Sequence, residues 1–183
     1  KQNGGKSAIA FDKFFGRSRT LTVTPTVFKV SRIPPDSAVF GYGNRIDSLA
    51  GSRNQRTILG GLNNTVTGNS TDTIVVGESN NVFNGGENAV FGTSHMIVSN
   101  VGNLVGGSQN ELLAGSNYNV VGGTRNVLTG NHVTDNAVFG AYNTVTSYTS
   151  IIGGSLNTAY GMIGSLMVGN GNALPQYNGS FYY

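Results

Sequence analysis

The chain has 183 residues, of which 28 are glycine, 10% are charged and none is cysteine, and its formal net charge is +3. The lack of cysteine excludes disulfides and thiolate metal sites, and the small net charge argues against nucleic acid as a partner. No apolar run reaches the length of a membrane helix, so membrane insertion is not expected.

Residues 1–36 form a non-repetitive N-terminal segment. The stretch SRTLTVTPTVFKV alternates like an amphipathic strand, in which Pro25 argues for an edge or a break. RIPPD then separates this segment from the rest of the chain. Seven of the eleven lysine and arginine residues precede residue 37. The segment is therefore predicted to be either a basic arm that docks on an acidic partner, or a solvated cap.

Residues 37–174 repeat a short pattern built around an anchor glycine. Nine copies follow one another at spacings of 14 to 20 residues. The anchors, predicted to be turn glycines, are Gly41, Gly61, Gly77, Gly92, Gly107, Gly123, Gly140, Gly154 and Gly169. The residues three positions after them are Asn44, Asn64, Asn80, His95, Asn110, Asn126, Asn143, Asn157 and Asn172. Apolar residues stand two and three positions before each anchor and five after it, and Ser, Thr or Asn stands four before it.

This period is too short for helical repeats, which need about 33 residues or more. The apolar columns are rich in β-branched residues, which favour strands. Each copy therefore predicts a short strand, a glycine turn, a second short strand and another turn. The repeat pattern therefore predicts an all-β fold. Its copies are expected to stack into a parallel β-solenoid of about nine coils, spaced by about 4.8 Å.

The asparagine column predicts a structural ladder. Stacked asparagines at one corner can hydrogen-bond along the stack, and asparagine tolerates the left-handed backbone of a turn. His95 is interpreted as a substituted member of this ladder and not as a metal ligand.

The first strand of each copy carries the main functional prediction. Residues three and two before the anchor point to opposite faces, yet both columns are apolar. Because a thin coil has one interior, the second face is expected to bury against another chain. The residues three and one before the anchor share a face, and their sizes compensate, as Ala38 stands beside Phe40 and Leu104 beside Gly106. Which of the two faces lies on the common axis stays open at this point. The proposed packing residues are Phe40, Ile58, Ile74, Phe91, Leu104, Val120, Phe139, Ile151 and Leu166.

Copies such as TILGGLNNTVTG, NVVGGTRNVLTG and SIIGGSLNTAYG resemble the head repeat of YadA-type trimeric autotransporter adhesins. Similar repeats occur in phage and virus fibre proteins. The resemblance implies a left-handed parallel β-roll and a homotrimer that buries one strand face of each chain around a common axis. The chain shows no heptad stalk and no C-terminal membrane barrel, so attachment by the autotransporter route is not expected. An excised head and a compact protein attached by its own N-terminal segment both stay open.

Residues 175–183, PQYNGSFYY, are aromatic and do not continue the repeat pattern. They are expected to cap the open edge of the last coil. A tip that binds a host-surface sugar or receptor protein is the alternative.

No catalytic, cofactor or metal residues are predicted. GGKS at 4–7 lacks the strand–loop–helix context of a phosphate-binding loop, and His95 and His132 have no evident metal-ligand partners. Six acidic residues of the repeat region share no column that would pair them as in a glycosidase. They are Asp47, Asp72, Glu78, Glu87, Glu111 and Asp135.

The expected function is a structural and adhesive module of a trimeric fibre on a virion surface that contacts a host. The alternative is the head of a bacterial trimeric adhesin at the cell surface. A polysaccharide-degrading tailspike would need clustered carboxylates. An ice-binding solenoid would need Thr-x-Thr in most coils, whereas it recurs in phase only at 65–67 and 144–146. Variable loops between Gly41 and Gly61 and at 130–136 could carry binding residues.

Overall fold

The computed structural model of the chain describes residues 36–47, 56–130, 132–175 and 181–182. The predictions made for residues 1–35, for the loop at 48–55 and for the tip at 176–180 lie outside the described residues. The described part consists of strands and turns. It includes no helix long and apolar enough to cross a lipid bilayer.

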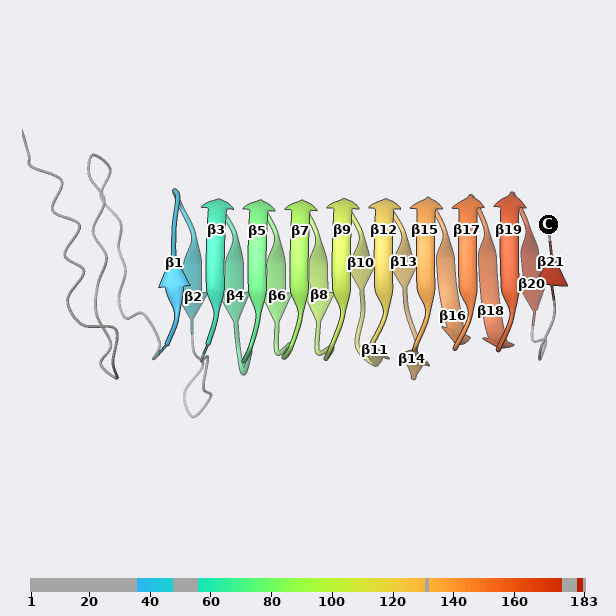
Figure 1. Cartoon of the computed structure of the whole chain (residues 1–183), viewed down its shortest axis with the longest axis horizontal. Helices are drawn as coiled ribbons and strands as arrows, with labels where there is room; N and C mark the ends of the chain where they lie inside the picture. The colour runs from blue at the N-terminus through green and yellow to red at the C-terminus, as the bar shows by residue number, and fades with distance from the viewer. Residues whose placement is uncertain (1–35, 48–55, 131, 176–180, 183) are drawn as a thin grey trace, which may run out of the picture.

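The strands stack in chain order along the long axis of the molecule (Figure 1). A ten-stranded sheet contains β1 (Ala38–Val39), β3 (Ile58–Leu62), β5 (Ile74–Glu78), β7 (Ala89–Thr93), β9 (Leu104–Ser108), β12 (Val120–Thr124), β15 (Ala137–Ala141), β17 (Ile151–Ser155), β19 (Leu166–Asn170) and β21 (Phe181–Tyr182). A nine-stranded sheet contains β2 (Arg45–Asp47), β4 (Thr65–Thr67), β6 (Asn81–Phe83), β8 (Met96–Val98), β10 (Glu111–Leu112), β13 (Val127–Leu128), β16 (Thr144–Tyr148), β18 (Thr158–Ile163) and β20 (Ala173–Pro175). The short strands β11 (Ser116–Asn117) and β14 (Val133–Thr134) pair separately.

All of these strand pairs are parallel, and successive strands of each sheet come from successive turns of the chain. The prediction of an all-β parallel β-solenoid is therefore confirmed. The anchor glycines share one register, since Gly61 pairs with Gly77 and Gly77 with Gly92, and the same pairing continues to Gly169.

The core is a thin apolar layer between the two large sheets. The ten-stranded sheet contributes the residue two before each anchor from Gly61 to Gly169, and the nine-stranded sheet contributes the residue five after each anchor from Gly61 to Gly154. These side chains are 0–2% exposed: Leu59, Val75, Val90, Val105, Val121, Val138, Ile152 and Met167 from the first sheet, and Val66, Val82, Ile97, Leu112, Leu128, Val145 and Ala159 from the second. Each coil thus has a single interior, and the other face of each strand points outward.

The C-terminal strand β21 extends the ten-stranded sheet. Residues 175–183 were expected to leave the repeat pattern and to cap the open edge of the last coil; within them, Phe181 pairs with Leu166 and Tyr182 pairs with Met167, so β21 lies along the edge of β19. The backbone of Phe181 therefore stands at the register position of Leu166.

Candidate functional site

The anchor glycines bring neighbouring coils into backbone contact. They adopt φ between 93° and 138°, a region that side chains rarely adopt. A Cβ on each anchor from Gly41 to Gly154 would lie 1.8–2.0 Å from the carbonyl oxygen of the next anchor. No other residue can occupy these positions without separating the coils at this corner.

The predicted asparagine column forms a continuous ladder of hydrogen bonds. Each backbone N–H in the column donates to the side chain of the preceding member at 2.9–3.1 Å. Asn126 illustrates the full pattern, because its Nδ2 also donates to Asn110 Oδ1 and to the carbonyl oxygens of Gly122 and Gly140. The members from Asn64 to Asn157 are 0–1% exposed. These amides therefore supply partners for each other and for backbone carbonyls at the anchor corner.

His95 takes the place of an asparagine in this ladder. Its Nδ1 accepts a hydrogen bond from the Asn110 backbone N–H at 3.1 Å, and its Nε2 lies 3.1 Å from the Phe91 carbonyl oxygen. A carbonyl oxygen only accepts, so Nε2 carries the proton and Nδ1 does not. Burial lowers the pKa of His95, although hydrogen bonds to backbone groups oppose the shift. The ring is thus held in one neutral tautomer.

A second ladder runs parallel to the first and was missed by sequence analysis. Asn88, Asn103, Asn119 and Asn136 stand four residues before successive anchors and are 0–2% exposed. Each backbone N–H in this series donates to the preceding Oδ1 at 2.9–3.0 Å, and each Nδ2 does so at 3.0–3.2 Å. Four asparagines in consecutive copies of one column were the signal that could have identified it.

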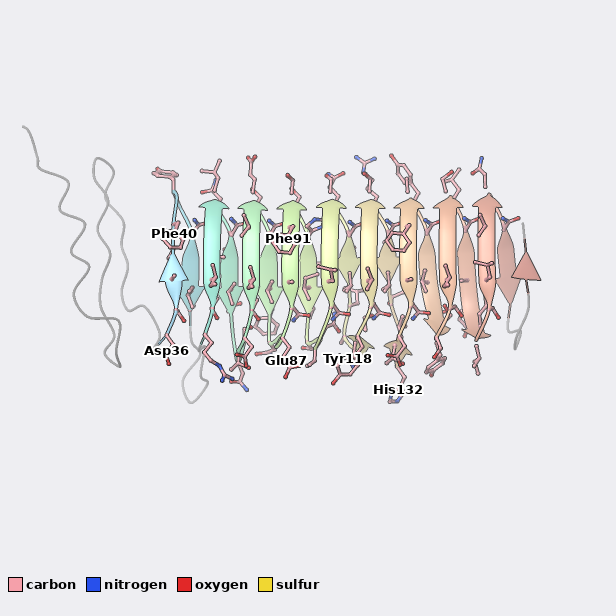
Figure 2. All side chains as sticks on the ribbon, viewed as in Figure 1. Asp36, Phe40, Glu87, Phe91, Tyr118 and His132 are labelled. Carbon is pink, nitrogen blue, oxygen red and sulfur yellow. The ribbon has the colours of Figure 1, made fainter. Side chains whose placement is uncertain are left out.

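The residues three and one before each anchor form the outer apolar face of the ten-stranded sheet. Figure 2 shows Phe40 and Phe91 on this side of the ribbon. Ten of its large side chains are 37–53% exposed: Phe40, Ile58, Ile74, Val76, Phe91, Leu104, Val120, Phe139, Ile151 and Val168. At about 150–200 Å² for each side chain, the face presents roughly 700 Å² of apolar surface, more than the ~300–600 Å² patch of a typical monomer.

The structure places the predicted packing residues on this face and not in the core. Leu166 is half-buried, and the other eight are exposed in the single chain. Size compensation operates between neighbouring strands as well as within one. A Cβ at Gly122 would lie 3.1 Å from the Phe139 ring, and one at Gly60 would lie 3.7 Å from Val76. Large side chains of one coil therefore cover the glycine of the coil before it.

Four acidic residues share one column at the opposite corner. Asp36, Asp72, Glu87 and Asp135 all stand five residues before an anchor, with φ of 53–57°. Figure 2 shows Asp36 and Glu87 along the same edge. Asp72 forms an ion pair with Arg56. The left-handed backbone accounts for the aspartates, since Asp and Asn visit that conformation more readily than most residues.

The Thr-x-Thr sequences lie on β4 and β16, which are not neighbours in the nine-stranded sheet. Within the described residues, no group of three or more His, Asp or Glu side chains could hold a metal ion. Comparisons of the chain with protein-family models, with curated proteins and with solved structures found no match.

Proposed function

We propose that this chain is a structural and adhesive module of a surface fibre, in which three copies bury their outer apolar faces around a common axis. The observation that carries the proposal is the roughly 700 Å² of exposed apolar surface, close to the ~800 Å² that each partner buries in a standard protein interface. Leaving such a face in water would favour aggregation.

The regularity of the face favours another copy of the chain as its occupant. One strand contributes to it at every coil from β1 to β19. A partner that fills it must present groups at the same spacing of about 4.8 Å, which a second copy of the solenoid does automatically. Identical subunits also close into symmetric assemblies without further surfaces.

The distribution of phenylalanine favours a narrow symmetric axis. Phe40, Phe91 and Phe139 occur at every third coil of the repeat, and the coils between them carry glycine or valine at that position. Where identical coils meet at one level, three phenyl rings fill the space near the axis. Smaller residues above and below leave room for those rings. The likeness to YadA-type head repeats supports the threefold axis and the left-handed winding, and the nine anchor glycines at spacings of 14–20 residues support a count of about nine coils.

A trimer of this kind is a stiff rod that exposes its corners and loops to the surroundings. In this proposal residues 1–36 attach the rod to another virion or appendage protein, and the exposed corners contact a host-surface glycan or protein. The virion surface is the proposed location, and the surface of a bacterial cell is the alternative.

The mass of the full chain in native solution tests this proposal. Light scattering should give about three times the 19.1 kDa of one chain. A stable, well-ordered species with the mass of one chain would refute the shared axis and the fibre function with it.

A further inference from the structure

The corner that follows the ten-stranded sheet carries a row of exposed side chains. Ser94, Gln109, Arg125, Tyr142 and Leu156 each stand two residues after an anchor glycine and have φ of 54–58°. This common backbone conformation sends their side chains in similar directions, one for every coil spacing of about 4.8 Å. Figure 2 shows side chains projecting in a row along this edge. We name these five residues the corner ledge.

Arg125 is held from both sides at the centre of the corner ledge. Its Nε donates to Gln109 Oε1 at 2.7 Å, and its Nη1 donates to Tyr142 Oη at 2.7 Å. The guanidinium carbon lies 5.4 Å from the centroid of the Tyr142 ring. These contacts fix a long, flexible side chain in one orientation, while most of its five N–H donors stay available.

The charge of Arg125 is not neutralised within the described part of the chain. Arg45 and Arg56 form ion pairs with Asp47 and Asp72. Among the described residues, Arg125 has no comparable carboxylate partner. Gln109 and Tyr142 add further hydrogen-bond donors beside Arg125. Gln109 Oε1 and Tyr142 Oη accept hydrogen bonds from Arg125, so the hydrogens of these two side chains are not used in those contacts. Their remaining hydrogens are those of the Gln109 amide N–H₂ and the Tyr142 hydroxyl.

We propose that Gln109, Arg125 and Tyr142 bind an anionic saccharide through its carboxylate or sulfate group. A guanidinium fork with adjacent N–H and O–H donors matches the acceptor oxygens of such a group. Tyr142 is 48% exposed, and its ring offers an apolar platform for the face of a sugar ring. The inference rests on the proposed adhesive function and names the ligand class. In a trimer, three such clusters would bind a multivalent surface with increased avidity.

Three probes that share one neutral core test the ligand class. Sialyllactose, sulfated lactose and lactose, each displayed on a neutral polymer, are offered to the full chain at physiological salt in biolayer interferometry. We expect one or both charged probes to bind at least tenfold more tightly than lactose. The stronger of the two identifies carboxylate or sulfate as the recognised group. Equal binding of lactose, or no binding of any probe, overturns the proposal.

Matched variants test the residues. Arg125→Gln should weaken binding of the charged probe at least tenfold. Arg125→Lys should cause a smaller loss, because lysine keeps the positive charge although it lacks the guanidinium fork. Arg56→Gln changes the net charge equally at the opposite corner and should leave binding unchanged. An equal loss in both glutamine variants would indicate general electrostatic attraction and overturn the site.

Light scattering on the same samples separates this inference from the proposed function. A trimer that adheres to host cells but ignores every probe refutes only the saccharide site. A monomer that binds a charged probe through Arg125 supports the site and refutes the trimeric fibre.

Discussion

Substitution of Leu104 by aspartate tests whether the outer apolar face is buried between chains. Leu104 lies on β9 in the middle of the face and is 46% exposed in the single chain. If the chain is monomeric, a carboxylate at this position remains in water, and the free energy of unfolding should fall only by about 1–1.5 kcal/mol, the contribution of the part of Leu104 that is already buried in the single chain. If three chains meet here, the aspartates are desolvated together.

The loss of association free energy in Leu104→Asp follows from the exposed fraction of Leu104. Complete burial of a leucine side chain contributes about 1.5–3 kcal/mol, so the 46% left exposed corresponds to about 1 kcal/mol per chain and ~3 kcal/mol per trimer. This alone lowers the association constant on the order of 100-fold. Three unpaired carboxylates in an apolar interface add several kcal/mol each, roughly the cost of a buried charge without a partner. The trimer should therefore dissociate at micromolar concentration.

Light scattering over a range of concentrations measures the mass, and circular dichroism shows whether the strands persist. Ser94→Asp is the matched control, since it adds the same charge at an exposed corner where aspartate tolerates the backbone. We expect the control to keep the wild-type mass. An unchanged mass for Leu104→Asp would refute burial of this face between chains.

Three further substitutions test the coil itself. Gly107→Ala should lower the free energy of unfolding by about 3 kcal/mol or more, because its Cβ would lie 2.0 Å from a carbonyl oxygen and its φ is +103°. Chemical denaturation measures this loss. The control is Gly86→Ala, whose Cβ would meet no atom closer than 3.4 Å. Asn126→Ala should cost about 2–4 kcal/mol, because buried donors and acceptors of the ladder lose their partners. Because burial lowers the pKa of His95 below its ordinary value of 6.5, protons bind the unfolded chain preferentially below that pH. The free energy of unfolding should therefore fall as the pH drops below about 6.5, and His95→Asn should reduce this dependence.

Each contrary result has a distinct physical meaning. Similar losses for the two glycine variants would mean that contact between the coils does not require glycine at the anchor. A near-neutral Asn126→Ala would mean that water replaces the amide. Unfolding measured at pH 7.5 and pH 5 for wild type and His95→Asn isolates the histidine, since all other titratable groups are common to both. Parallel pH profiles would exclude His95 as the source of the pH dependence.

The solenoid could be predicted from the sequence because its requirements are local and recur in every coil. An anchor such as Gly77 must be glycine wherever two coils touch, and a ladder residue such as Asn64 must be an amide wherever a buried corner needs both a donor and an acceptor. Repetition made these requirements visible as columns. The apolar columns on opposite faces of one strand, as at Ile58 and Leu59, also indicated that one face lies outside the coil, but the tertiary structure decided which face this is.

Contacts between side chains of neighbouring coils were decided only by the tertiary structure. The column four residues before the anchors was visible as Ser, Thr or Asn, but the direction of Asn103 into the coil makes it a second ladder. The left-handed corners place Gln109, Arg125 and Tyr142 side by side, although 16 and 17 residues separate them in sequence. The sequence alone therefore determined the architecture of the coil, because backbone sterics and burial repeat with its period. The stacking of coils decided which side chains meet, because side-chain direction depends on backbone conformation at each corner.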